Sequence, residues 1–285
     1  MQHSREGLFA VHAAVLIFGF TALFSKLLSL PALEITFYRS IFAFVVIAVY
    51  LAYKNRPYLL DSSSDYLMAM LLGVLLAAHW VSYFYAMQVS SVAVGVIALY
   101  TFPVITVFLE PIFHGERPHV ADILSSLAVL FGIYLIVPDF SLDDSVTIGV
   151  LSGIFSAFMM SLRNIMQRRY FSAYSASQAL FYQTSVVAMV LLFFSETAIT
   201  SIEDAQWWLL VLLGVVFTAL PHTLFAHGLL HLKAKTASLI ACVQVVYAAV
   251  FAAVLLGEWL SWNVVVGGCI VISAAMYESL PRKSS

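Results

Sequence analysis

Residues 90–116 read SSVAVGVIALYTFPVITVFLEPIFHGE, and this stretch decides the fold. It contains an apolar run of about 22 residues, which is long enough to cross a hydrocarbon core of about 30 Å as a helix. Pro103 lies near the middle of the run, and Gly115-Glu116 ends it. A related stretch at residues 236–258, TASLIACVQVVYAAVFAAVLLGE, ends in Gly257-Glu258. The recurrence predicts a membrane protein that is built from two copies of one unit.

The composition indicates that most of the chain lies in lipid. Of the 285 residues, 62% are hydrophobic and 10% are charged, whereas soluble domains carry about 25% charged residues. The net charge of −2 disfavours nucleic acid as a partner. Cys242 and Cys269 both lie inside apolar runs, so we expect small buried side chains and no disulfide framework. The first run, from Leu8, lacks a clear cleavage site, and we interpret it as a first span rather than a signal peptide.

Ten apolar runs are long enough to span a bilayer. They cover residues 8–28, 33–53, 66–87, 92–113, 120–138, 147–169, 175–195, 206–228, 236–256 and 261–280. A proline and three aspartates in residues 138–144 mark the boundary between two halves. We therefore predict an all-α integral membrane protein with ten transmembrane helices. Residues 1–138 form a first five-helix repeat in this prediction, and residues 145–285 form the second.

The basic residues indicate how the chain is oriented. If the N-terminus lies in the cytoplasm, only Lys26 and Arg39, of the 13 Lys and Arg residues, fall toward the outside. Basic residues are enriched on the cytoplasmic side, so both termini are predicted to be cytoplasmic. Since each half has an odd number of spans, the second copy enters the membrane from the opposite side. Such inverted repeats are typical of secondary transporters, whose site lies between the halves.

Several short motifs follow one another along the chain in a fixed order. The first half has LIFGF at residues 16–20, Ser25-Lys26, Phe37-Tyr38-Arg39 and the run from Pro103 to Gly115-Glu116. Phe37-Tyr38 aligns with Phe181-Tyr182, 144 residues further on. Together these motifs resemble the drug/metabolite transporter superfamily, in its ten-span form with two EamA-type domains. The chain departs from the family at Phe18, where Trp is frequent, and at Gln244-Val245, where Glu-Pro or a similar pair is common.

The resemblance covers nearly the whole chain and implies transport. Members of the superfamily are mostly proton- or exchange-coupled exporters of amino acids and other small metabolites. Some members import their solutes, and some carry nucleotide sugars or sugar phosphates. The resemblance therefore implies a small-molecule solute and a lipid bilayer as partners, with protons as candidate coupling ions, but it names no substrate.

Polar groups inside spans are costly in lipid, so we expect them to face protein or a water-filled cavity. The candidate solute-binding residues are Phe18, His79, Trp80, Tyr100, His222, Gln244 and Tyr247. The Gln244 amide can donate and accept, which suits a zwitterion or a hydroxyl, and Tyr247 is nearly one turn further on. A helix–helix hydrogen bond is the alternative for Gln244. For Trp80, packing or lipid contact is the alternative to stacking on a solute.

A second group of residues is predicted to move or to carry protons. His79 can change charge near neutral pH and, with Glu110, is a candidate proton carrier, although it could equally bond a backbone carbonyl. Glu110 and Arg163 are expected to face protein or water and to pair as an inner gate, a static pair being the alternative. Pro103 removes a backbone hydrogen bond and is the candidate hinge, with an ordinary kink as the alternative. Arg39 could bind a carboxylate, but snorkelling to the outer interface is the favoured interpretation.

Motifs for other functions are absent. The sequence has no GxxxxGK[ST], HExxH or GxSxG pattern and no aspartate deep in a span, so we predict no catalytic residue, metal or cofactor. The HGERPH run at residues 114–119 is interpreted as a solvated turn. Few charges lie near the midplane, which makes a nucleotide sugar a poor fit.

The expected function is secondary active transport in a bacterial-type inner membrane, with export of small amino-acid-like or other neutral or zwitterionic metabolites. Import is the alternative within transport, and a non-transporting membrane receptor or an enzyme is the alternative from another class. No motif specifies the oligomeric state.

Overall fold

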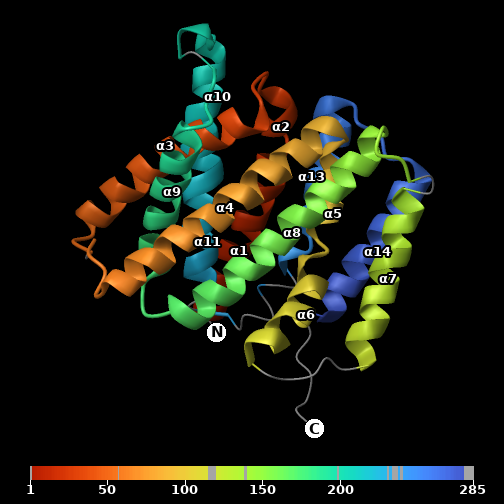
Figure 1. The fold of residues 1–285 in the computed structure, drawn as a ribbon, viewed down its shortest axis with the longest axis horizontal. Helices are drawn as coiled ribbons and strands as arrows, with labels where there is room; N and C mark the ends of the chain where they lie inside the picture. Colours follow the sequence, from red (N-terminus) through yellow and green to blue (C-terminus); the bar gives the residue numbers. More distant parts are fainter. Residues whose placement is uncertain are drawn as a thin grey trace.

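A computed structural model describes residues 2–56, 58–114, 120–137, 140–197, 199–229, 231–232, 237 and 240–278. Within these ranges the chain is helical and has no strand (Figure 1). The main helices are α1 (Gln2–Thr21), α2 (Phe24–Leu27), α3 (Ala32–Tyr53), α4 (Ser63–Val89), α5 (Val92–Leu99), α6 (Phe102–His114), α7 (Val120–Ile136), α8 (Ser145–Tyr170), α9 (Ala176–Leu192), α10 (Asp204–Gly214), α11 (Leu220–Leu229), α13 (Gln244–Leu256) and α14 (Trp262–Glu278). A π-helical turn, η2 (Val215–Ala219), joins α10 to α11. A short 3₁₀ turn, η1 (Ile199–Ser201), precedes α10.

The described helices include 6 that are long and apolar enough to cross a membrane. They are Arg5–Leu27, Ala32–Tyr53, Ser63–Val89, Val92–Glu110, Ser145–Tyr170 and Asp204–Phe225. Shorter apolar helices cover Asp122–Ile136, Ala176–Leu192, Gln244–Leu256 and Trp262–Glu278. All of these segments fall within the predicted apolar runs or overlap them. The chain is therefore an all-helical, multi-pass membrane protein.

Local capping explains where several helices begin and end. Ser62, Ser91 and Ser175 each accept a hydrogen bond from the backbone N–H three residues further on, which satisfies a free N–H at the helix start. Asp144 caps α8 in the same way, and its bond from the Thr147 N–H lowers the pKa of its carboxyl. Gly257 ends α13 with φ of 70°, a left-handed conformation that glycine adopts without steric cost.

The helices formed by the two related stretches, residues 90–116 and 236–258, are each interrupted by a turn. Tyr100 and Thr101 form a turn between α5 and α6, because the Pro103 ring removes an N–H and clashes with the preceding turn of helix. Cys242 and Val243 form a matching turn before α13, 142 residues further along. The second break has no proline, so the sequence predicted only the first. The Gly115-Glu116 end of the first run lies outside the described residues.

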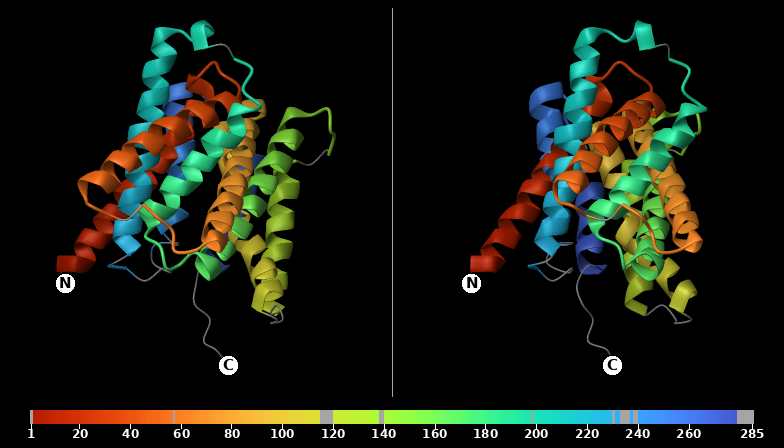
Figure 2. Two further views of the ribbon diagram at one scale, coloured as in Figure 1. Left: turned by 60° about the vertical axis from the view of Figure 1, so that its left-hand side comes forward. Right: turned by 90° about the vertical axis from the view of Figure 1, so that its left-hand side faces the viewer.

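The helix contacts between the two halves recur when the halves are exchanged. Helix α4 packs against α8, and α11 packs against α1. Helix α3 packs against α9, while α7 and α14 form a pair at one edge of the bundle (Figure 1). The start of α1 and the end of α14 lie at one end of the bundle, as the views in Figure 2 also show. The opposite end carries α2, the turn between α4 and α5, and the C-terminal end of α13, and we call it the far end.

Candidate functional site

A polar cavity of about 130 Å³ lies between the helices, which is room for several water molecules. It is lined by Phe18 and Thr21 of α1, Arg39 of α3, His79, Trp80 and Tyr83 of α4, Leu99 of α5, Met160 of α8, His222 of α11 and Gln244 of α13. A larger hollow of about 560 Å³ between α7 and α14 is lined mainly by apolar side chains. The smaller cavity is the candidate site, because there convergent polar groups could orient a solute.

Aromatic and imidazole rings from three helices meet in this cavity. The ring centroid of His222 lies 4.9 Å from that of Phe18 and 6.1 Å from that of Trp80. On α4, the His79 and Tyr83 rings stack at 6.1 Å, as their spacing of four residues predicts. The structure thus brings together Phe18, His79, Trp80, His222 and Gln244, five of the predicted solute-binding residues.

The hydrogen bonds of the two histidines indicate which ring nitrogen carries hydrogen. Nδ1 of His79 lies 2.7 Å from the Ser156 hydroxyl, which itself donates to the His79 carbonyl at 2.9 Å. Nδ1 of His222 lies 2.7 Å from the carbonyl oxygen of Thr218, which can only accept. Both Nδ1 atoms are therefore donors, and Nε2 of each neutral ring is left as an acceptor. The π-helical turn η2 contains Thr218, and such turns are frequent at functional sites.

Two predicted contacts lie behind the cavity or beside it. The buried Tyr100 hydroxyl lies 3.1 Å from Oε1 of Gln244 and also contacts the Ala241 carbonyl, so Tyr100 positions the amide without lining the cavity. Tyr247 packs with Val11 and Val15 of α1. Its position follows from the close approach of α1, since a Cβ on Gly19 would lie 2.7 Å from Cβ of Tyr247. Buried Pro103 is the second residue of α6 and also lies outside the lining.

Arg39 lines the cavity, which contradicts the interpretation that it snorkels to the interface. Its side chain is only 3% exposed, and its guanidinium carbon lies 4.1 Å from the Trp80 ring centroid. Arg39 is the eighth residue of α3, about 10 Å along the helix from its start. A cation over an aromatic face is stabilised there, which holds the side chain inside. Its presence within an apolar run was a usable signal for a functional residue. The cavity also contains Thr21, Tyr83, Leu99 and Met160, none of which was on the predicted list.

The predicted pair between Glu110 and Arg163 is not formed. Glu110 pairs with Arg168, more than one turn further along α8. The Arg163 Nε donates instead to Oε1 of Gln183 at 2.7 Å, and Nη1 donates to Oδ1 of Asn164 at 3.1 Å. Arg163 therefore points toward α9, because the rotation of α8 presents a different residue to α6.

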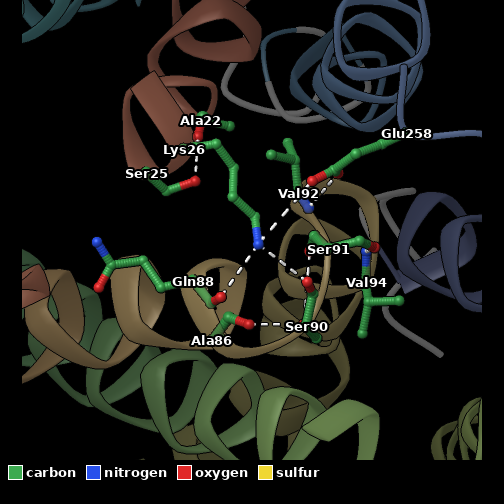
Figure 3. Close-up of polar contacts among 10 residues, drawn as sticks. All are labelled: Ala22, Ser25, Lys26, Ala86, Gln88, Ser90, Ser91, Val92, Val94 and Glu258. Atoms are coloured by element: carbon green, nitrogen blue, oxygen red, sulfur yellow. Dashed lines mark hydrogen bonds and ion pairs between the residues drawn. The ribbon is translucent and has the colours of Figure 1, made fainter. Parts of the chain in front are cut away.

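A cluster of polar contacts lies at the far end of the bundle (Figure 3). Nζ of Lys26 donates to the carbonyl oxygens of Gln88 at 3.0 Å and Ser90 at 3.1 Å, and it lies 3.9 Å from Oε1 of Glu258. Oε2 of Glu258 accepts from the backbone N–H of Val92 at 2.9 Å. Lys26 and Glu258 thus join α2, the α4–α5 turn and the end of α13. The equivalent Glu116 lies outside the described residues.

Membrane-spanning helices around a cavity with several convergent polar side chains define a membrane protein with a candidate internal site for a small solute. The chain belongs to the EamA-like transporter family, whose model matches residues 5–137 and again residues 147–278. This result confirms the resemblance inferred from the short motifs. It also confirms that the protein is a transporter and not an enzyme.

Similar proteins cover almost the whole chain. An uncharacterized transporter of Archaeoglobus fulgidus is 25% identical over 95% of this chain and 96% of its own length. The pseudopaline exporter CntI of Pseudomonas aeruginosa is 26% identical over 90% of this chain and 88% of its own length. A solved crystal structure superposes with a TM-score of 0.65 at 15% identity and covers 96% of this chain and 95% of that chain. This last similarity concerns the fold alone.

Proposed function

We propose that the protein is a secondary active transporter that exports small amino-acid-like or other neutral or zwitterionic metabolites from the cytoplasm across a bacterial-type inner membrane. The observation that carries this proposal is the cavity between helices of both halves, into which several polar side chains converge. Polar groups there would replace the water around a solute, while Phe18, Trp80 and Leu99 would contact its apolar part. Export is supported by the similarity to a pseudopaline exporter. Pseudopaline itself is the substrate of that relative and is not proposed for this chain.

The proposed architecture is ten transmembrane helices in two inverted five-helix repeats, residues 1–138 and 145–285, with both termini in the cytoplasm. Three observations support it. The helix pairings recur when the halves are exchanged, the broken helices are 142 residues apart, and the family model matches twice. Inverted repeats with discontinuous helices at the midplane are the architecture that alternating access uses.

Alternating access requires that one end of the cavity closes while the other opens. In this proposal the far end is the outer end, and the cluster of Lys26 and Glu258 holds it shut. The pairs on the opposite side, including Glu110 with Arg168, would form part of the inner closure. Pro103 and the turn at Tyr100-Thr101 would provide a hinge between α5 and α6, since a broken helix bends at less cost than a continuous one.

The cavity assignment predicts that Trp80→Leu abolishes export, because Trp80 contacts both Arg39 and His222 inside the cavity. The measurement is a comparison of metabolites in spent medium from cells that overproduce the native protein or the variant. Trp208→Leu is the matched control, because Trp208 is 76% exposed on α10. We expect a compound that accumulates outside with the native protein and the control only. Equal accumulation with Trp80→Leu would exclude this cavity as the route. Depletion of a compound by the native protein would indicate import.

Proton coupling through His79 predicts that His79→Gln flattens the pH dependence of transport, because an amide cannot take up a proton as an imidazole can. Glutamine can still donate to Ser156, so the packing between α4 and α8 is kept. The test is initial transport rate against external pH, with His12→Gln, which is exposed on α1, as the control. A native profile in the His79 variant would assign the proton to another group.

A further inference from the structure

We propose that Arg39 binds a carboxylate group of the transported solute, so that the substrate class is small carboxylate-bearing metabolites. This inference rests on the proposed function, since it takes the polar cavity as the solute site. It concerns a residue that sequence analysis had assigned to the interface.

The guanidinium of Arg39 has no counter-charge among the residues that the structure describes. Within the described part of the chain it makes no hydrogen bond and no ion pair, and its buried Nε has no partner. Its close contacts are the faces of Trp80 and Phe84, at 4.1 Å and 5.1 Å from the ring centroids. Stacking stabilises the cation but uses none of its five N–H donors. A buried, unpaired cation is strongly unfavourable, so an anion entering the cavity would be bound tightly.

Acidic groups that could neutralise Arg39 are engaged elsewhere. Glu34, one and a half turns earlier on α3, accepts from the Ser195 hydroxyl at 2.8 Å and from the N–H groups of Glu196 and Thr197 at 2.9 Å and 3.1 Å. Glu258 binds Lys26 and Val92 at the far end, and Glu110 pairs with Arg168. These contacts leave the guanidinium free to bind a ligand.

The residue that corresponds to Arg39 in the second half differs from it in having its polar atoms paired. Arg39 aligns with Gln183, 144 residues further on, whose side chain is fully buried. The Gln183 amide accepts from Arg163 and donates to Gln167 at 3.0 Å, so all of its polar atoms have a partner. One half of the bundle therefore satisfies this position internally, whereas the other presents an unsatisfied cation to the cavity. An asymmetric site with one free guanidinium matches a solute with one carboxylate.

The rest of the cavity suits the other parts of such a solute. Helix α13 begins at Gln244 in the cavity wall, and its N-terminal N–H groups favour negative charge nearby. The Nε2 acceptors of neutral His79 and His222 could receive an ammonium or hydroxyl hydrogen. Arg is suited to this role, because its planar fork can bind both oxygens of a carboxylate. The volume of about 130 Å³ limits the solute to a small metabolite in this conformation.

The test measures binding to the purified full-length protein in detergent, read as the shift in melting temperature. The probes are the free amino acids, one at a time, each paired with its carboxamide, which has the same side chain and no carboxylate. We expect at least one amino acid to stabilise the native protein and its carboxamide to bind at least about ten-fold more weakly, as expected for the loss of a charge-assisted pair. Arg39→Met should lose the preference for the acid, and Arg56→Met, at an exposed position, should keep it.

The variants separate folding from binding. Replacement of an unpaired buried charge by an apolar side chain is tolerated or stabilising, so Arg39→Met should melt at or above the native temperature. Arg39→Lys keeps the charge without the fork and should bind more weakly than native. Equal binding of acid and carboxamide by the native protein, or an unchanged preference in Arg39→Met, would overturn the carboxylate assignment. Export of a compound in spent medium would still stand in that case. Absence of any export or uptake would instead refute the proposed function.

Discussion

Replacing Lys26 by methionine makes the cavity accessible from the far end and lowers the transport rate. Nζ of Lys26 holds two backbone carbonyls of the α4–α5 segment and approaches Glu258. Hydrogen bonds to a charged group contribute about 1.5–3 kcal/mol each when shielded. The two side chains are 26% and 22% exposed, so we discount the total contribution to about 1–2 kcal/mol. That range shifts the ratio of closed to open far ends by about 5- to 30-fold.

The measurement is the rate at which a membrane-impermeant maleimide labels a Leu99→Cys variant. Leu99 lines the cavity and is 5% exposed. The background first replaces Cys242 and Cys269 by alanine, which removes both native thiols. Lys26→Met should label several-fold faster than the parent when the reagent is added outside the cell, where the proposed orientation places the far end. Lys54→Met is the control, because Lys54 is exposed at the end of α3.

A second variant separates the ion pair from the hydrogen bonds. Glu258→Gln keeps an acceptor for the Val92 N–H but removes the charge that faces Lys26. Its labelling rate should lie between those of the parent and Lys26→Met. Identical labelling in all three proteins would show that this cluster does not close the far end. Faster labelling only when the reagent is added on the cytoplasmic side would assign the far end to the cytoplasm and reverse the proposed orientation.

Gly267→Ala is expected to have the largest effect on stability, because the added methyl group would push the backbones of α14 and α7 apart. An added Cβ on Gly267 would lie 2.5 Å from the carbonyl oxygen of Gly132 on α7. No side-chain rotation can relieve a clash with backbone, so α14 must move away from α7. Helices in lipid associate through close approach at small residues, and loss of that approach weakens the pair. Overpacking of this kind costs about 1–3 kcal/mol, and we expect the upper end of that range.

The neighbouring residue provides a matched control. A Cβ on Gly268 would lie 2.8 Å from Cδ1 of Ile97, the flexible end of a side chain that can rotate away. Gly268→Ala should therefore melt close to the native protein, while Gly267→Ala should melt lower by about 5 °C or more. The measurement is thermal unfolding of both purified variants in the same detergent. A larger loss in Gly268→Ala would show that α7 and α14 do not approach each other at these glycines.

The same two glycines illustrate what composition alone cannot decide. The apolar runs 120–138 and 261–280 identify two helices, but nothing in either run specifies that they meet. Each of these helices packs against a helix of the other half: α7 pairs with α14, and α3 pairs with α9. Such pairs are far apart in the chain, so their recognition depends on the shape of assembled helices rather than on any local pattern.

The site was predictable in part, because helical spacing places residues on a common face. His79, Trp80 and Gln244 were predicted to contact the solute from their positions within apolar runs, and all three line the candidate cavity. Tyr247 was expected beside Gln244 because it is nearly one turn further on. It instead packs on α1, since the turn before α13 sets the rotation of the helix. Sequence spacing gives the angle between two side chains but not the direction in which the pair points.

By itself, the sequence determined that the chain is helical, that it lies in a membrane, and that it belongs to a family of transporters. Those conclusions depend on local quantities: the length of apolar runs, the positions of Pro103 and Gly257, and the order of short motifs. Only the tertiary structure decided that Arg39 is buried with no ionic partner in the described part of the chain, that Glu110 pairs with Arg168, and that a second helix breaks at Cys242-Val243. In lipid, a polar side chain is stabilised by whichever neighbouring helix presents a partner, and that choice is made by the rotation and packing of the whole bundle.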